Sequence, residues 1–200
     1  MPCYGRAIAR RRWPRSGRYG MPYAIEIRFD ESSETQLREI WRSAAVFYST
    51  EYLFSNRVIP HISLVVSDED LGGVFDVLAP LSTKVRLSGT GFFLDGDIAY
   101  LKAEPDPEVL SYHLGVVSAC DALGLAVSNH YRPGEWVPHC TLAQQCATNR
   151  ALPLQDVDMV VGVGSLMLVE YPPTRILAET CIEPPSESSV GPLACPGSKL

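Results

Sequence analysis

A chain of 200 residues with 46% hydrophobic and 20% charged residues has enough apolar side chains for one soluble domain, and no apolar run reaches the roughly 18 residues that span a bilayer. Residues 1–20 hold six arginines and no acid, which leaves eleven basic and 23 acidic residues, a net charge of −12, from Met21 onward. Because general affinity for long nucleic acid depends on neutralising phosphates, this acidic body excludes that function class and favours a small ligand in a local pocket.

The two ends differ in composition from the body, which spans residues 21–183. Residues 1–20 are predicted to be a disordered basic extension or an over-long gene start, with an organelle transit peptide as the alternative. Residues 184–200 are rich in Pro and Ser and are predicted to be a disordered tail. We expect a cytoplasmic monomer with unpaired cysteines; the alternative is a peroxisomal protein, if Ser198-Lys199-Leu200 is a targeting signal.

Hydrophobic periodicity predicts a mixture of strands and helices in the body. In chain order, strands are expected at 23–29, 61–66, 84–94, 98–103, 139–143, 163–169 and 175–182, and helices at about 33–52, 68–81 and 106–122. Ser32 or Ser33 is expected to cap the first helix. The third helix is expected to bury the stripe Val109, Leu110, Leu114, Val117 and Ala122. Hairpins mixed with helices favour an α+β fold over a doubly wound parallel sheet.

Two of the predicted strands begin with the same pattern. Pro60-His61-Ile62-Ser63-Leu64 and Pro138-His139-Cys140-Thr141-Leu142 match at the proline, histidine, hydroxyl and leucine positions. Since side chains alternate along a strand, each histidine shares a face with the hydroxyl residue two positions later. The repeat therefore predicts two similar lobes, each of which presents one strand to a shared cleft.

Two facing His-x-Ser/Thr units have the chemistry of a phosphodiesterase. One neutral imidazole can remove a proton from the attacking oxygen, and the other, protonated, can donate to the leaving oxygen. The hydroxyls of Ser63 and Thr141 can donate to phosphate oxygens. Two histidines without a third ligand make an incomplete zinc site, so neither a metal nor another cofactor is expected.

The paired motifs resemble those of the 2H phosphoesterases, which include 2′-5′ RNA ligase-like proteins and cyclic phosphodiesterases. The resemblance covers roughly residues 22–183 and implies a bilobal α+β fold around a central cleft. It also implies hydrolysis or transfer at 2′,3′-cyclic phosphates or 2′-5′ linkages. By position, His61 and His139 would be the acid and base, and Ser63 and Thr141 would bind phosphate. Many relatives carry a basic residue after the second motif, where this chain has Gln144 and Gln145.

Other side chains near the motifs are candidates for substrate binding. Tyr131 and Trp136 could stack on a base, and Arg132 and Arg57 could hold a phosphate. The alternatives are that Trp136 belongs to the core and that Arg132 is solvated. We interpret His130 as a loop residue and His113 as structural. Cys140 is not expected to pair with His139 as a nucleophile, because adjacent strand residues point apart.

The sequence supports two main functional hypotheses. The first is a metal-independent phosphodiesterase that acts on a small nucleotide or a short RNA end, with RNA ligase-like activity possible. The second is a protein that binds such a nucleotide in the same cleft without turnover. The motifs do not distinguish which histidine is the acid and which is the base.

Overall fold

The computed structural model describes residues 22–93, 97–104, 106–146 and 157–181, so the predicted disordered ends and most of the turn predicted at 95–97 lie outside the described residues. The described residues form seven strands: β1 (Tyr23–Phe29), β2 (His61–Ser67), β3 (Lys84–Phe93), β4 (Ile98–Ala103), β5 (His139–Gln144), β6 (Asp158–Glu170) and β7 (Arg175–Cys181). They pair in the order β2-β1-β6-β3-β4-β5, with β7 also on β6, and every pairing is antiparallel. The predicted α+β class is confirmed.

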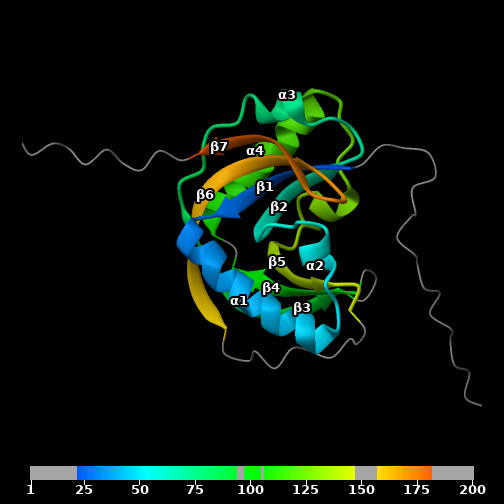
Figure 1. The fold of residues 1–200 in the computed structure, drawn as a ribbon. Helices are drawn as coiled ribbons and strands as arrows, with labels where there is room; N and C mark the ends of the chain where they lie inside the picture. Colours follow the sequence, from blue (N-terminus) through cyan, green and yellow to red (C-terminus); the bar gives the residue numbers. More distant parts are fainter. Residues whose placement is uncertain (1–21, 94–96, 105, 147–156, 182–200) are drawn as a thin grey trace, which may run out of the picture.

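The long strand β6 joins the two lobes of the molecule (Figure 1). Its first residues, from Asp158 to Gly162, pair with β3, and its later residues pair with β1 and β7. The first lobe therefore contains β1, β2, β7 and the end of β6, and the second lobe contains β3, β4, β5 and the start of β6. Gly164 lies at the junction, where an added Cβ would come within 2.8 Å of the Phe29 carbonyl oxygen. The sequence pattern predicted only the part of β6 from residue 163 onward.

The two long helices connect the lobes. Each helix follows a strand of one lobe in the chain but packs on a strand of the other lobe. Helix α1 (Glu31–Tyr48) follows β1 but packs on β5, and α4 (Pro107–Ala122) follows β4 but packs on β2. The short helix α2 (Tyr52–Ser55) also contacts β5. Strands β2 and β5 lie at opposite ends of the pairing order, yet they contact each other. The two motif strands are therefore adjacent.

Helix α1 begins and ends differently from the prediction. Its N-cap is Asp30, whose carboxylate accepts the Ser33 N–H at 2.7 Å, so the expected cap at Ser32 or Ser33 is wrong. The helix ends at Ser49, which has a φ of 52°, and Tyr52 starts the separate helix α2. Chain reversal at Ser49 brings α2 back onto β5.

The second predicted helix is mostly absent from the structure. Only α3 (Gly72–Phe75) forms, because the acidic residues expected at a helix N-terminus bind turn backbone instead. Asp70 accepts the Gly72 N–H at 2.9 Å, and Glu69 accepts the Ala126 N–H at 2.7 Å. Two consecutive glycines, Gly72 and Gly73, also disfavour a longer helix.

Helix α4 has the predicted bounds but buries a different stripe. Leu110, Leu114 and Ala122 are exposed, which contradicts the prediction for them. The buried side chains are Val109, His113, Val116, Val117 and Cys120. Both stripes have helical spacing, so the choice between them is made by the surface on which α4 docks.

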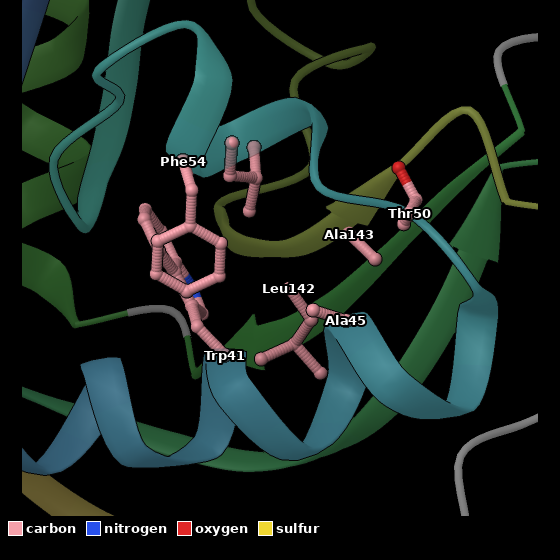
Figure 2. A pocket seen from close by; sticks show the side chains of 7 residues that line it. Trp41, Ala45, Thr50, Phe54, Leu142 and Ala143 are labelled. Atoms are coloured by element: carbon pink, nitrogen blue, oxygen red, sulfur yellow. The ribbon is translucent and has the colours of Figure 1, made fainter.

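A small apolar cavity lies between α1, α2 and β5 (Figure 2). Its volume is about 10 Å³, which is at the lower limit for holding one water molecule. Trp41 forms part of its wall, and among the described residues the Trp41 Nε1 has no hydrogen-bond partner. Leu142 also lines it, on the strand face opposite His139 and Thr141. This cavity is therefore separate from the motif side chains.

Candidate active site

The two motif histidines have matching backbone hydrogen bonds. His61 Nδ1 lies 2.6 Å from the Ile59 carbonyl oxygen, and His139 Nδ1 lies 2.7 Å from the Val137 carbonyl oxygen. Since a carbonyl oxygen only accepts, each Nδ1 carries a hydrogen and donates it. In both rings the remaining nitrogen, Nε2, is the one that can exchange a proton with a ligand.

The structure brings His61 and His139 into one site. Burial lowers the pKa of His139, the hydrogen bond to the Val137 carbonyl partly offsets this, and the nearby His61 lowers it further. The indole Nε1–H of Trp136 donates to the Ser63 carbonyl oxygen at 3.0 Å, and the Cys140 sulfur is hydrogen-bonded to the His61 backbone. These bonds tie the second motif to the first.

Aromatic rings surround His139. Its ring lies edge-on to Phe93, with a centroid distance of 5.0 Å, and 5.2 Å from Tyr100. Phe93 and Tyr100 stack on each other at 4.2 Å. Gly91 allows this arrangement, because an added Cβ there would lie 2.3 Å from the Tyr100 ring. The apolar surroundings explain the lowered pKa of His139, since burial disfavours its charged form.

His61 has a carboxylate beside it instead. The Oε1 atom of Glu26 on β1 lies 3.2 Å from His61 Nε2 and accepts the Ser63 hydroxyl at 3.4 Å. Glu26 is buried, and desolvation raises its pKa, partly offset by His61 and Ser63. The sequence pattern gave no functional role to Glu26, because its side chain alternates onto the face of β1 that was predicted to be exposed to solvent. The acid in the middle of an apolar strand, Ile25-Glu26-Ile27, was the available signal.

A second small core explains why both faces of β1 are buried. Ala24 on β1 clusters with Val66, Met167 and Val169, and Tyr131 and Tyr171 pack against this cluster. The half-buried strand predicted from alternation is therefore buried on both sides. The cluster covers the face on which Glu26, His61 and Ser63 lie, because cross-strand partners share a face.

Ser63 and Thr141 lie on their strands as the alternation predicts. Both are partly exposed, whereas Ile62, Leu64, Cys140 and Leu142 are buried. The Ser63 hydroxyl, which donates to Glu26, is also hydrogen-bonded to Tyr131. Burial raises the pKa of Tyr131 to about 12, so its phenol is neutral near pH 7. Tyr131, a predicted base-stacking residue, thus contacts the site through Ser63.

The other three predicted substrate-binding residues, Trp136, Arg132 and Arg57, have different surroundings from those of Tyr131. Trp136 stacks on His113, with ring centroids 3.9 Å apart and planes 12° apart, in addition to its bond to Ser63. His113 is buried, and its Nε2 lies 2.9 Å from the Tyr131 carbonyl oxygen. Arg132 forms an ion pair with Asp121 of α4 at 2.6 Å. Arg57 is exposed after α2, with a φ of 56°.

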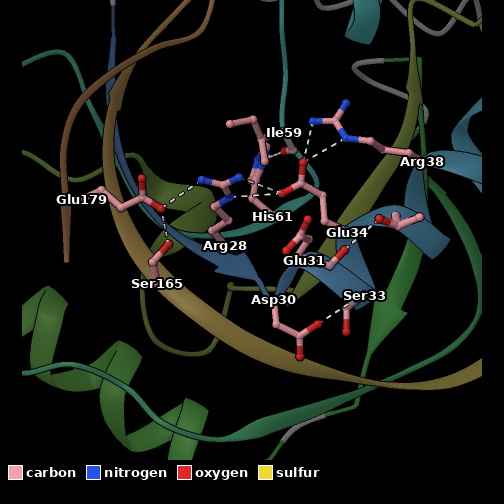
Figure 3. Close-up of polar contacts among 11 residues, drawn as sticks. Arg28, Asp30, Glu31, Ser33, Glu34, Arg38, Ile59, His61, Ser165 and Glu179 are labelled. Atoms are coloured by element: carbon pink, nitrogen blue, oxygen red, sulfur yellow. Dashed lines mark hydrogen bonds and ion pairs between the residues drawn. The ribbon is translucent and has the colours of Figure 1, made fainter. Parts of the chain in front are cut away.

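A charged network borders His61 on its other side (Figure 3). Arg28, the cross-strand partner of His61, donates to Glu34 and to Glu179, and Arg38 donates to the other oxygen of Glu34. These residues line a hollow of about 480 Å³, within the size range of small-molecule sites. Its lining has more acidic than basic groups, because Asp30 and Glu31 also border it.

Two further structural facts concern the described part of the chain. No group of three or more His, Cys, Asp or Glu side chains there could hold a metal ion. No helix among those residues is both long and apolar enough to cross a membrane.

Comparisons with known proteins identify the family and the fold of this chain. A search of curated proteins by sequence found no match. Solved structures with the same fold include a phosphoesterase (15% identity, TM-score 0.59, 82% of this chain and 98% of that one), E. coli LigT complexed with 3′-AMP (16%, 0.58, 82% and 98%) and TT0787 of Thermus thermophilus (18%, 0.58, 80% and 97%). The model of the 2′-5′ RNA ligase superfamily matches residues 29–157, the segment that contains both motifs. The chain therefore belongs to the 2′-5′ RNA ligase superfamily of 2H phosphoesterases.

Proposed function

We propose that this chain is a metal-independent phosphodiesterase that acts on a small RNA-derived nucleotide, with a 2′,3′-cyclic phosphate or a 2′-5′ linkage as the reacting group. The observation that carries the proposal is the matched pair of imidazoles. Both Nδ1–H groups are bonded to backbone carbonyls, so in both rings Nε2 is the nitrogen left to exchange a proton with a substrate. Two imidazoles, one that accepts a proton and one that donates a proton, are suited to acid–base catalysis near neutral pH.

Hydrolysis of a cyclic phosphate requires one proton acceptor and one proton donor. His139 suits the acceptor role, because its lowered pKa keeps it neutral at pH 7. It removes a proton from water as the water oxygen bonds to phosphorus. His61 donates a proton to the ribose oxygen whose bond to phosphorus breaks, which leaves a phosphate monoester.

The hydroxyls of Thr141 and Ser63 are proposed to donate to the non-bridging phosphate oxygens. Thr141 shares the partly exposed face of β5 with His139. The Ser63 hydroxyl donates to Glu26 in the structure, so it must rotate to reach a phosphate. The face that His139 and Thr141 share favours phosphate binding beside β5.

Two observations favour a small substrate. The body of the chain carries a charge of −12. A long polyanion would be repelled by these charges. E. coli LigT, which has the same fold, has been crystallised with 3′-AMP, ATP and NADP+, all of which are small nucleotides.

The test is a panel of 2′,3′-cyclic nucleotides and short 2′-5′-linked oligonucleotides, assayed in the presence of a chelator with identification of the products. Turnover is expected for at least one of them. His61→Ala and His139→Ala should each lower the rate by about 10²-fold or more. His130→Ala is the matched control, because His130 is exposed in the loop before the second motif. Unchanged rates in both motif variants would overturn the proposal.

One observation favours nucleotide binding without turnover as the second candidate. In the structure Glu26 engages both His61 Nε2 and the Ser63 hydroxyl, so two of the four proposed reacting groups already have partners. Calorimetry that detects nucleotide binding, with no product after long incubation, would support this second function instead.

A further inference from the structure

Glu26 lies outside both motifs but touches both functional groups of the first one. We infer that Glu26 is a positioning residue that shares one proton with His61 and thereby makes His61 the proton donor of the pair. The shared proton is a property of these two side chains and can be tested without a substrate. The role of His61 as proton donor rests on the proposed function.

The hydrogen bonds of His61 require this proton. Nδ1 donates to the Ile59 carbonyl oxygen, so in a neutral ring Nε2 would carry only a lone pair. Nε2 lies 3.2 Å from Glu26 Oε1, and a carboxylate oxygen facing a lone pair would be repelled. A proton between the two atoms turns this repulsion into a charge-assisted hydrogen bond.

The burial of Glu26 supplies the driving force. Glu26 is 4% exposed. Among the described residues, His61 is the only one with which it forms an ion pair. A buried carboxylate without a cation is costly, so the pair retains a proton in preference to leaving Glu26 charged and alone. The Ser63 hydroxyl donates to the same oxygen, which favours a deprotonated Oε1 and hence a proton on His61.

The proton can reach a ligand through His61 and not directly through Glu26. The His61 side chain is 16% exposed and the Glu26 side chain 5%. His61 also begins the strand that contacts β5, where His139 lies. Glu26 therefore acts on the reaction through His61, whose bond to Ile59 fixes the ring.

The surroundings of the two histidines differ although their motifs match. His139 has the rings of Phe93 and Tyr100 beside it, and no described residue forms an ion pair with it. A carboxylate at one imidazole and aromatic rings at the other favour protonation of the first and neutrality of the second. This asymmetry gives a direction to proton transfer that the repeated motifs lack.

Other ionisable groups face this pair from every neighbouring element. Arg28 lies two residues along β1, and its charge is engaged by Glu34 and Glu179. Met167 of β6, the partner of Glu26, is not ionisable. The remaining groups are Tyr131 from η1 (Asn129–Tyr131), Tyr171 after β6, Glu179 on β7 and His139 on β5. Burial raises the pKa of both tyrosines, so they stay neutral near neutral pH.

The experiment compares Glu26→Gln, which keeps the shape but cannot carry a negative charge, with Glu26→Asp, which keeps the charge. Glu179→Gln is the matched control, because it removes a carboxylate from the same sheet face that is bonded to Arg28 and Ser165 instead of His61. Circular dichroism and thermal unfolding establish that each variant is folded. Two readouts follow: NMR titration of the His61 ring proton, assigned with His61→Ala, and the pH dependence of kcat/KM on a cyclic nucleotide.

Glu26→Gln should weaken the retention of a proton by His61, because the carboxylate beside Nε2 is lost. The alkaline limb of the kcat/KM profile should therefore move to lower pH, with about a tenfold loss of rate on that limb and little loss at lower pH. In Glu26→Asp the alkaline limb should lie closer to that of the natural protein, because the carboxylate is kept. In Glu179→Gln the alkaline limb should not move. An unchanged His61 titration in folded Glu26→Gln would overturn the inference. A shifted titration in a protein that turns over no substrate would instead reject the proposed function and keep the inference.

Discussion

The indole N–H of Trp136 donates a hydrogen bond to the carbonyl oxygen of Ser63 across 3.0 Å, and its ring stacks on His113 of α4. Trp136 therefore connects three parts of the site: the segment before the second motif, the first motif strand and the helix that covers it. This relationship assigns Trp136 a role in holding the two motifs together, where the sequence had suggested stacking on a base.

Replacement of Trp136 with Phe should destabilise the protein by about 1–3 kcal/mol, because the partly buried Ser63 carbonyl loses its donor while the stacking on His113 is retained in part. The free energy of unfolding in urea measures this change. Activity should fall as the motifs separate, with KM for a mononucleotide changed less than kcat. A variant as stable as the natural protein would show that the hydrogen bond contributes nothing.

His113→Phe should produce a stability difference that depends on pH. Burial lowers the pKa of His113 below 6.5, so the native state stays neutral where the unfolded state takes up a proton. The native protein therefore loses this contribution to stability as pH falls through 6.5 towards the native pKa, and the variant does not.

The free energy of unfolding of the natural protein should therefore exceed that of His113→Phe by less at about pH 5 than at about pH 7. Urea unfolding at each pH measures this difference. His130→Phe serves as the control, because His130 is exposed. A gap that is constant over this range would contradict the lowered pKa.

Cys140→Ala should retain activity within a few-fold. The thiol is fully buried, and burial raises its pKa to about 12, so it is neither a thiolate nor accessible at neutral pH. The variant should lose about 1–2 kcal/mol of stability from the cavity and the lost bond to the His61 backbone. Iodoacetamide should leave Cys140 unmodified in the folded protein, as mass spectrometry of peptides would show; rapid alkylation would contradict the buried position.

Gly91→Ala should disturb His139 through Tyr100. The new methyl group would overlap the Tyr100 ring, which must turn away from Gly91 and from its position beside His139. The cost is about 1–3 kcal/mol. With less apolar cover, the pKa of His139 should rise towards 6.5, so the acid limb of the kcat/KM profile should move to higher pH.

The control for this variant is Gly115→Ala on α4, where an added Cβ has no neighbour within 4 Å. It should leave the profile unchanged and raise helix stability by up to about 1 kcal/mol. An acid limb that stays in place in Gly91→Ala would mean that Tyr100 does not control the desolvation of His139.

Local periodicity in the sequence was enough to predict one set of features. A strand repeats every two residues, so the pattern indicated that His61 and Ser63 share a face, as do His139 and Thr141. The strands at β1, β2, β4 and β5 and the extent of α4 followed within a residue for the same reason. The repeated motif also indicated two lobes with one cleft.

Contacts between segments that are distant in the sequence determined the burial of Glu26 and the buried face of α4, which the sequence pattern could not predict. Alternation put Glu26 on a solvent-facing phase, but Met167, Tyr131 and Tyr171 cover that face, and strand pairing sets Glu26 opposite Ser63. The buried stripe of α4 was likewise chosen by docking on β2. Local patterns fix the direction of a side chain relative to its own strand or helix, whereas the burial and charge around it come from neighbours far away in the sequence. For this reason the two histidines were evident from the sequence, and the difference between them was not.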